Sequence, residues 1–240
     1  SLSNPIAAVG NVAYNERDVV VVQARSSGFV EKLFVRATLD RVRKGQPLAE
    51  LYVPDWIAAQ EEYLTAKRLR RSVDAMALGG LADAAAQRMR LAGMTEEQIQ
   101  AINRGDAVQP RVTITSPIDG VVGELAAREG MTVAPGAPLF RLNGLSTVWV
   151  NAEVPETAAA EVRPGSPVEA RTPAFPGMVF KGRVNAIVPE VNAATRTLKA
   201  RVELANPGAR LVPGMFATVH LAPMKRGDVV LVPTEAVIQT

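Results

Sequence analysis

One sequence pattern occurs twice, at residues 24–51 and again at residues 115–142. Each copy holds two glycines at matching positions: Gly28 and Gly45 in the first, Gly120 and Gly136 in the second. The intervals between these glycines differ by a single residue, and each copy continues with a Pro-Leu pair and a closing leucine. Self-similarity of this kind indicates repeated structural units. Because half of such a unit cannot bury its apolar face alone, we expect the two copies to pair into one small β-sandwich.

Each copy has the sequence of a short β-unit. Its first glycine permits a tight or left-handed backbone at the start of a strand. A short apolar strand, a polar stretch and a Gly-x-Pro-Leu turn then lead into a second strand. This pattern resembles the lipoyl and biotinyl carrier fold, in which the four glycines are packing and turn positions. In a carrier the joining hairpin presents a lysine for modification, whereas residues 52–56 stand at that joint here and contain no lysine, so we expect no covalent cofactor.

About fifty residues of helical pattern separate the two copies. Apolar residues from Trp56 to Met76 recur near a 3.6-residue period, which indicates an amphipathic helix. A second helical run begins at Leu81 and is interrupted at Gly93, and residues 95–98 form a capping box that restarts a helix. We expect an antiparallel helical hairpin with two arms of about 24 residues, although the interruption leaves a folded three-helix form open. The predicted tip of the hairpin consists of Leu78, Gly79 and Gly80.

Strand patterns return after the second copy. They lie at residues 148–154, 178–184, 197–204 and 216–221, with Gly and Pro turns between them. Strands at this spacing predict a small barrel or sandwich. The predicted fold class is therefore α+β and mainly β.

Short motifs in a fixed order resemble the periplasmic adaptors, or membrane fusion proteins, of tripartite efflux pumps. These motifs lie at residues 145–150, 154–156, 194–198, 211–215 and 232–237. Residues 54–56 and 60–64, together with residues 90–94, are most similar to the heavy-metal branch of this family. The adaptors of that branch serve resistance-nodulation-division pumps that export copper, silver, zinc, cobalt or nickel.

The resemblance implies an elongated adaptor in the periplasm, attached to the inner membrane by a segment outside this chain. Its implied partners are an inner-membrane resistance-nodulation-division transporter, an outer-membrane channel protein and further copies of itself in a ring. The alternative is an adaptor for organic substrates such as drugs, or for secretion, without metal binding. The implied domains are N-terminal strands (1–23), a first lipoyl half (24–53), the α-helical hairpin (54–106), a second lipoyl half (107–145), a β-barrel (146–222) and the start of a membrane-proximal domain (223–240).

Composition restricts the chemistry that the chain can perform. One histidine and no cysteine in 240 residues remove most nucleophile–base pairs and every thiolate metal site. The sequence contains no Walker-type phosphate loop, so we expect no enzyme. The net charge of +3 is small and the basic residues are scattered, so we expect no nucleic-acid partner. A basic run at residues 67–71 is either a solvated helix face or a docking surface for a partner.

The single histidine is the candidate metal ligand. In the strand at residues 216–221, period two places His220 on the face opposite the apolar side chains. Imidazole and carboxylate ligands together suit zinc, so we expect a divalent ion, above all zinc. The alternative is a solvated histidine at the end of a strand. The predicted ligand set consists of His220, Asp228 and Glu235.

Overall fold

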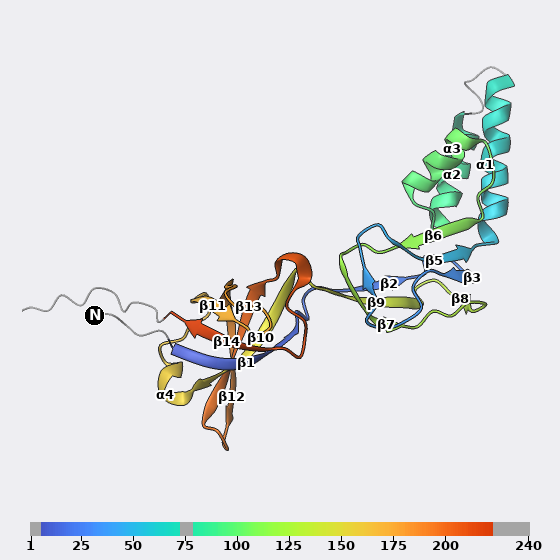
Figure 1. Ribbon diagram of the computed structural model, residues 1–240. Coiled ribbons are helices and arrows are strands. Elements are labelled where there is room, and N and C mark those ends of the chain that lie inside the picture. The colour runs from blue at the N-terminus through green and yellow to red at the C-terminus, as the bar shows by residue number, and fades with distance from the viewer. Residues whose placement is uncertain (1–5, 73–78, 223–240) are drawn as a thin grey trace, which may run out of the picture. The chain divides into compact units, whose positions relative to one another are not determined.

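Figure 1 shows the computed structural model, which describes residues 6–72 and 79–222. The chain divides into two compact units. One unit spans Glu16–Gly144, and the other combines the residues up to Asn15 with those from Leu145 onward. Both are built mainly from antiparallel strands, and three helices are inserted into the first. The expected mainly-β class is confirmed.

The unit that includes the N-terminal strand is a closed six-stranded β-barrel. In barrel order its strands are β1 (Ile6–Tyr14), β10 (Thr147–Pro155), β13 (Thr197–Ala205), β12 (Phe180–Asn192), β11 (Pro167–Arg171) and β14 (Phe216–Leu221). Every second residue of a barrel strand points inward, and along β10 the side chains of Val148, Val150, Ala152 and Val154 are accordingly buried. Two short helices join strands of this unit, α4 (Glu156–Ala159) and the 3-10 helix η1 (Pro207–Ala209).

The other unit contains a sandwich of two four-stranded sheets. One sheet has the order β2 (Val19–Gln23), β9 (Pro138–Gly144), β7 (Gly120–Leu125) and β4 (Arg41–Val42). The other has the order β6 (Arg111–Thr115), β5 (Pro47–Tyr52), β3 (Gly28–Leu33) and β8 (Thr132–Val133). Residues 1–23, which we expected to form one leading segment, are divided between the units, because β1 belongs to the barrel and β2 to the sandwich.

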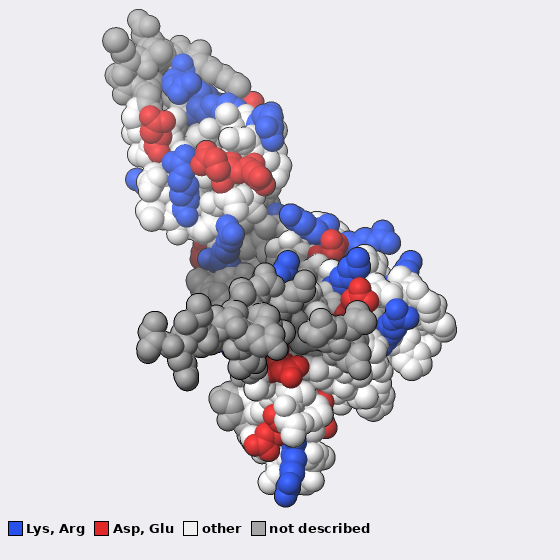
Figure 2. All heavy atoms as spheres, turned by 90° about the vertical axis from the view of Figure 1, so that its left-hand side faces the viewer, with Lys and Arg blue, Asp and Glu red and all other residues white. Residues whose placement is uncertain are grey.

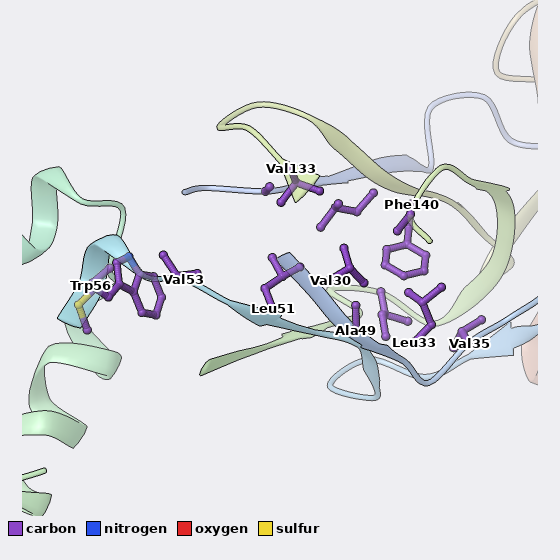
Figure 3. Close-up of a cluster of buried hydrophobic side chains, with 14 of the residues drawn as sticks. Val30, Leu33, Val35, Ala49, Leu51, Val53, Trp56, Val133 and Phe140 are labelled. Carbon is purple, nitrogen blue, oxygen red and sulfur yellow. The ribbon is translucent and has the colours of Figure 1, made fainter. Parts of the chain in front are cut away.

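The two copies of the repeat exchange strands. The first copy gives β3 and β5 to one sheet and β4 to the other, and the second copy gives β7 and β9 to that other sheet and β8 to the first. Gly28 pairs with Val133 and Gly120 pairs with Val42, so matching residues occupy matching places. The inner faces enclose a common core around Phe140 (Figure 3). Neither copy completes a sheet alone, and the expected pairing of the copies is therefore observed.

The repeat glycines serve two different purposes. Gly45 and Gly136 have a left-handed backbone with φ of +83° in both cases, at the turn that precedes the Pro-Leu pair. Gly28 and Gly120 are not left-handed; a Cβ atom on either would overlap a backbone carbonyl oxygen of the neighbouring strand. Of the tight or left-handed backbone that the sequence allowed at the start of each copy, the left-handed form is not adopted, and the close approach of two strands explains these glycines.

Three helices lie between β5 and β6: α1 (Asp55–Ser72), α2 (Gly79–Leu91) and α3 (Glu96–Gly105). The expected hairpin with two long arms is not present among the described residues, because the return arm breaks at Gly93. This glycine has φ of +89°, and two backbone hydrogen bonds of a Schellman motif end α2 there. Thr95 then starts α3 with the expected capping box, in which Thr95 and Gln98 each accept a hydrogen bond from the other's backbone N–H. The folded three-helix form is the one observed.

Candidate functional site

His220 lies on β14, between β1 and β11 in the barrel. Its side chain is half-buried on the outer face, because its neighbours along the strand are buried inside the barrel. In the register of the sheet His220 lies opposite Ala7 on one side and Glu169 on the other. Glu169 is therefore the carboxylate that the fold places beside this histidine.

Basic side chains surround the pair of His220 and Glu169. A surface hollow over β11, β12 and β14 is lined by both of them and by Arg171, Lys181 and Arg183. Lys181 lies directly opposite Glu169 in the strand register. Three cations against one carboxylate raise the electrostatic cost of placing a metal cation in the hollow.

A complete zinc site is not formed by the described part of the chain. No group of three or more His, Cys, Asp or Glu side chains there is placed to hold a metal ion. Zinc in proteins takes three or four protein ligands. The predicted co-ligands Asp228 and Glu235 lie outside the described residues, as do the rest of residues 223–240. A zinc site at His220 therefore needs ligands beyond those that the structure describes.

Buried hydrogen bonds of Trp56, Ser26 and Gln60, which we call the helix-base lock, join the base of the helices to the sandwich. The indole Nε1 of Trp56 donates to the carbonyl oxygen of Ala92 at 2.8 Å and to Ser26 Oγ at 3.2 Å, and Ser26 Oγ itself donates to Ala92. Gln60 is fully buried; it accepts from Gln109 N at 2.6 Å and donates to Gln109 O at 3.0 Å. Trp56 packs beside the sandwich core at the start of α1 (Figure 3). Because buried polar groups are costly to leave unpaired, this helix-base lock specifies how the helices meet the sandwich.

Two of the three predicted tip residues, Gly79 and Gly80, lie in a helix. Gly79 and Gly80 are the first residues of α2, so the helical pattern resumes at this pair instead of breaking there. Leu78 lies outside the described residues. The structure therefore brings two of the three predicted tip residues into one helical turn.

The basic residues of the run at 67–71, in α1, have different surroundings. Lys67 forms an ion pair with Asp106 and donates to the carbonyl oxygen of Asn103, which ties α1 to the end of α3. Arg68 and Arg70 are exposed to solvent. On the molecular face in Figure 2, basic side chains are interspersed with acidic ones. Lys67 thus has a structural partner, whereas Arg68 and Arg70 lie on a solvated helix face.

A second ion pair lies on the outer face of the sandwich. Arg111 on β6 contacts Glu31 on β3 through two hydrogen bonds, of 2.7 Å and 3.1 Å, and its guanidinium lies 5.5 Å from the centre of the Tyr52 ring. The hydrogen bond from Arg111 holds the pKa of Glu31 below its ordinary value. The arrangement orders three side chains on an exposed surface and presents no nucleophile.

Sequence reasoning missed Glu169 and the helix-base lock. Glu169 was not recognised because its neighbour His220 lies on a strand about fifty residues later and meets it only when the barrel closes. Gln60 did have a signal in the sequence, since it lies four residues from both Trp56 and Leu64. A polar side chain at that spacing falls on the apolar face of the helix and must find a buried partner.

Two family profiles match the chain. The barrel-sandwich hybrid domain of CusB matches residues 19–143, and the CusB-like β-barrel domain matches residues 147–225. These ranges correspond to the two compact units. Over the described ranges, no helix is both long enough and apolar enough to span a membrane.

Similar proteins match over nearly the whole chain. The cation efflux system protein CusB of Escherichia coli K12 is 38% identical over 233 residues, which cover 96% of this chain and 55% of CusB. SilB of Salmonella typhimurium, named a membrane fusion protein, is 37% identical over 236 residues, which cover 96% of this chain and 52% of SilB. The chain thus spans about half the length of these curated relatives.

A solved structure has a similar fold. It is a MacA–MexA chimeric protein that contains the α-hairpin domain of Pseudomonas aeruginosa MexA, with 23% identity and a TM-score of 0.53. The match covers 92% of this chain and 80% of the chimera. The family profiles, the two relatives and this fold agree over both the sandwich and the barrel. The chain belongs to the CusB-like family of heavy-metal resistance-nodulation-division membrane fusion proteins.

Proposed function

We propose that this chain is the central part of a periplasmic adaptor for the export of heavy-metal cations. In this role it links an inner-membrane resistance-nodulation-division transporter to an outer-membrane channel protein, and several copies assemble into a ring. The observation that carries the proposal is the match of both units to CusB-like domains, together with the similarity to CusB, a cation efflux system protein. The anchor to the inner membrane would lie outside this chain.

The role is mechanical and needs no chemistry at a catalytic centre. Membrane fusion proteins are structural linkers without enzymatic activity, in agreement with the expectation that the chain is no enzyme. The helix-base lock of Trp56, Ser26 and Gln60 supports this role, because buried hydrogen bonds keep the helices in one orientation on the sandwich. In the proposal the end of the helices near Gly79 contacts the channel.

The test is a deletion of the gene in its own host, followed by complementation with the full-length protein. We expect the deletion to lower tolerance to copper, silver, zinc, cobalt or nickel salts, and complementation to restore it. Tolerance to organic drugs should not change. Loss of drug tolerance with unchanged metal tolerance would favour the drug or secretion adaptor instead.

Metal binding by the adaptor itself is a separate proposal. His220 is the predicted ligand, with Asp228 and Glu235 as the predicted co-ligands, and zinc as the expected ion. Titration calorimetry of the full-length protein with zinc should give a weaker affinity for His220→Ala than for the wild type. Thr218→Ala, on the same strand face, is the matched control. Equal zinc affinity of wild type and His220→Ala would contradict a ligand role for this histidine.

A further inference from the structure

The hollow over β11, β12 and β14 is lined by basic side chains from all three strands. Arg171 lies on β11, Lys181 and Arg183 lie on β12, and His220 lies on β14. Along β11 the alternate residue Ala170 is buried inside the barrel, and along β14 the neighbours of His220 are buried as well. Period two therefore places the side chains that line the hollow together on the outer face.

The hollow carries an excess of positive charge. Glu169 is the only carboxylate among the described residues that line it. Within the described ranges no ion pair joins Glu169 to Arg171, Lys181 or Arg183, whereas Arg111 in the sandwich is paired with a glutamate. With the imidazole counted as neutral, three cations and one carboxylate leave a net charge of +2 in the hollow. The hollow therefore attracts anions, and a dianion most strongly.

The lining residues also indicate the kind of anion. Arginine binds phosphate oxygens in pairs through its planar guanidinium, lysine adds a point charge, and a neutral imidazole adds one N–H donor. Because these donors come from three strands, they suit a tetrahedral phosphate, whose acceptor oxygens point in several directions. The hollow has a volume of about 930 Å³ and is also lined by Pro167, Val168 and Ala222. It thus has room and apolar surface for an organic group attached to the phosphate.

A peptide bound as an added strand does not fit this part of the barrel. β11 pairs with both β12 and β14, and each of those strands has a second neighbour in the closed barrel. Binding by strand addition needs a free strand edge, which these strands do not offer. The ligand is therefore recognised by side chains.

We propose that this hollow binds a small organic phosphate, a phosphomonoester with two negative charges. Arg171, Lys181 and Arg183 contact the phosphate oxygens, and the apolar lining residues contact the organic group. Glu169 limits the affinity, because its negative charge repels the phosphate. The inference goes beyond the proposed adaptor function and does not rest on it.

Titration calorimetry of the full-length protein with phenyl phosphate tests the site, with EDTA present so that no metal ion contributes. At about pH 7.5 this phosphate carries close to two negative charges. Phenyl sulfate has a similar shape but one negative charge, and should bind about fivefold more weakly. Arg171→Gln and Lys181→Gln should each weaken the binding of phenyl phosphate about fivefold. Lys199→Gln removes an exposed charge on β13 outside the hollow, and as the matched control should bind like the wild type.

Glu169→Gln gives the sharpest result, because its effect should have the opposite sign. Removal of the one carboxylate raises the net charge of the hollow, so phenyl phosphate should bind about threefold more tightly. A site in which Glu169 holds a metal ion would instead lose affinity for that ion in the same variant. The sign of the change thus distinguishes an anion site from a metal site.

Four outcomes would overturn the inference. The first is a wild-type protein that does not bind phenyl phosphate at millimolar concentration. The second is weakening by Lys199→Gln equal to that by Lys181→Gln, as expected for unspecific attraction to a basic surface. The third is weaker binding in Glu169→Gln. The fourth is binding to phosphatidylglycerol vesicles that phenyl phosphate does not displace but Arg171→Gln abolishes, which would assign the hollow to a lipid head group.

Discussion

The sandwich and the barrel are both completed by strands that come from distant parts of the sequence, but by different routes. In the sandwich, β4 and β8 are exchanged between two copies of one pattern. In the barrel, β1 precedes the whole sandwich in the sequence and yet lies between β10 and β14. A repeat indicates from the sequence that two distant segments belong to one sheet or sandwich, because each strand has a matching strand in the other copy. β1 has no matching strand elsewhere in the sequence, so its neighbours in the barrel could not be predicted.

The largest expected effect comes from the glycines that let strands approach closely in each unit. A Cβ at Gly120 in the sandwich or at Gly182 in the barrel would overlap a backbone carbonyl oxygen. Gly120→Ala and Gly182→Ala should each lower the free energy of unfolding of their own unit by about 3 kcal/mol. The two tryptophans, Trp56 and Trp149, report on one unit each, so urea unfolding followed by fluorescence of single-tryptophan variants separates the two effects.

Gly45→Ala is the matched control for this comparison. The space around Gly45 is open, but its φ is +83°, so only backbone strain of about 1 kcal/mol is expected. If Gly120→Ala shifted the Trp149 transition as far as the Trp56 transition, the two units would unfold together and the comparison between them would fail.

A smaller effect is expected from two buried amides, one in each unit. Gln60 pairs with the backbone of Gln109 at the base of the helices, and Asn206 in the barrel accepts from Leu211 N and donates to two carbonyl oxygens. Truncation to alanine leaves these backbone groups without a partner and should cost about 2 kcal/mol in each case. Hydrogen exchange should show faster exchange at Gln109 N–H in Gln60→Ala and at Leu211 N–H in Asn206→Ala.

Gln100→Ala, at an exposed position on α3, is the control and should change neither amide. If Gln60→Ala left exchange at Gln109 and in the three helices unchanged, the helix-base lock would not be what orients the helices. Apolar packing around Trp56 and Met89 would then be what determines the orientation of the helices on the sandwich.

The smallest effect concerns pH and the ion pair of Glu31 with Arg111. The hydrogen bond from Arg111 lowers the pKa of Glu31, so the pair stabilises the fold above the ordinary glutamate range of about pH 4.3 and is lost as the pH falls through the lowered pKa. Arg111→Ala should raise the midpoint of the Glu31 carboxyl titration, followed by NMR, toward the ordinary value. Arg111→Lys should raise it less, because the charge remains but the bidentate bond does not. An unchanged midpoint in Arg111→Ala would contradict this cause.

Much of the local structure followed from sequence pattern. The duplication predicted a two-copy sandwich, the alternating residues predicted the barrel strands, and residues 95–98 predicted the cap that begins α3. The sequence left a two-armed hairpin and a folded three-helix form open, because Gly93 can either be tolerated within a helix or end it, and only the packing of its neighbours decides. In this fold a Cβ at Gly93 would overlap Ser26, a residue of the helix-base lock.

The candidate site was less predictable than the fold. His220 was placed correctly on the outer face of its strand by period two, but Glu169 and the surrounding bases were not foreseen. Their proximity depends on which strands become neighbours when the barrel closes. No pattern in the sequence indicates that β11, β12 and β14 lie side by side.

The sequence by itself determined the repeat, the strand periods, the helix caps and the family to which the chain belongs, since each of these depends on residues close in the chain or on matching motifs. Only the tertiary structure decided that β1 completes the barrel, that α2 and α3 form separate helices beside α1, and that Lys32 and Glu124 occupy equivalent places on opposite faces. The physical reason is that buried hydrogen bonds and strand pairing between distant segments depend on the whole fold, and local pattern does not carry that information.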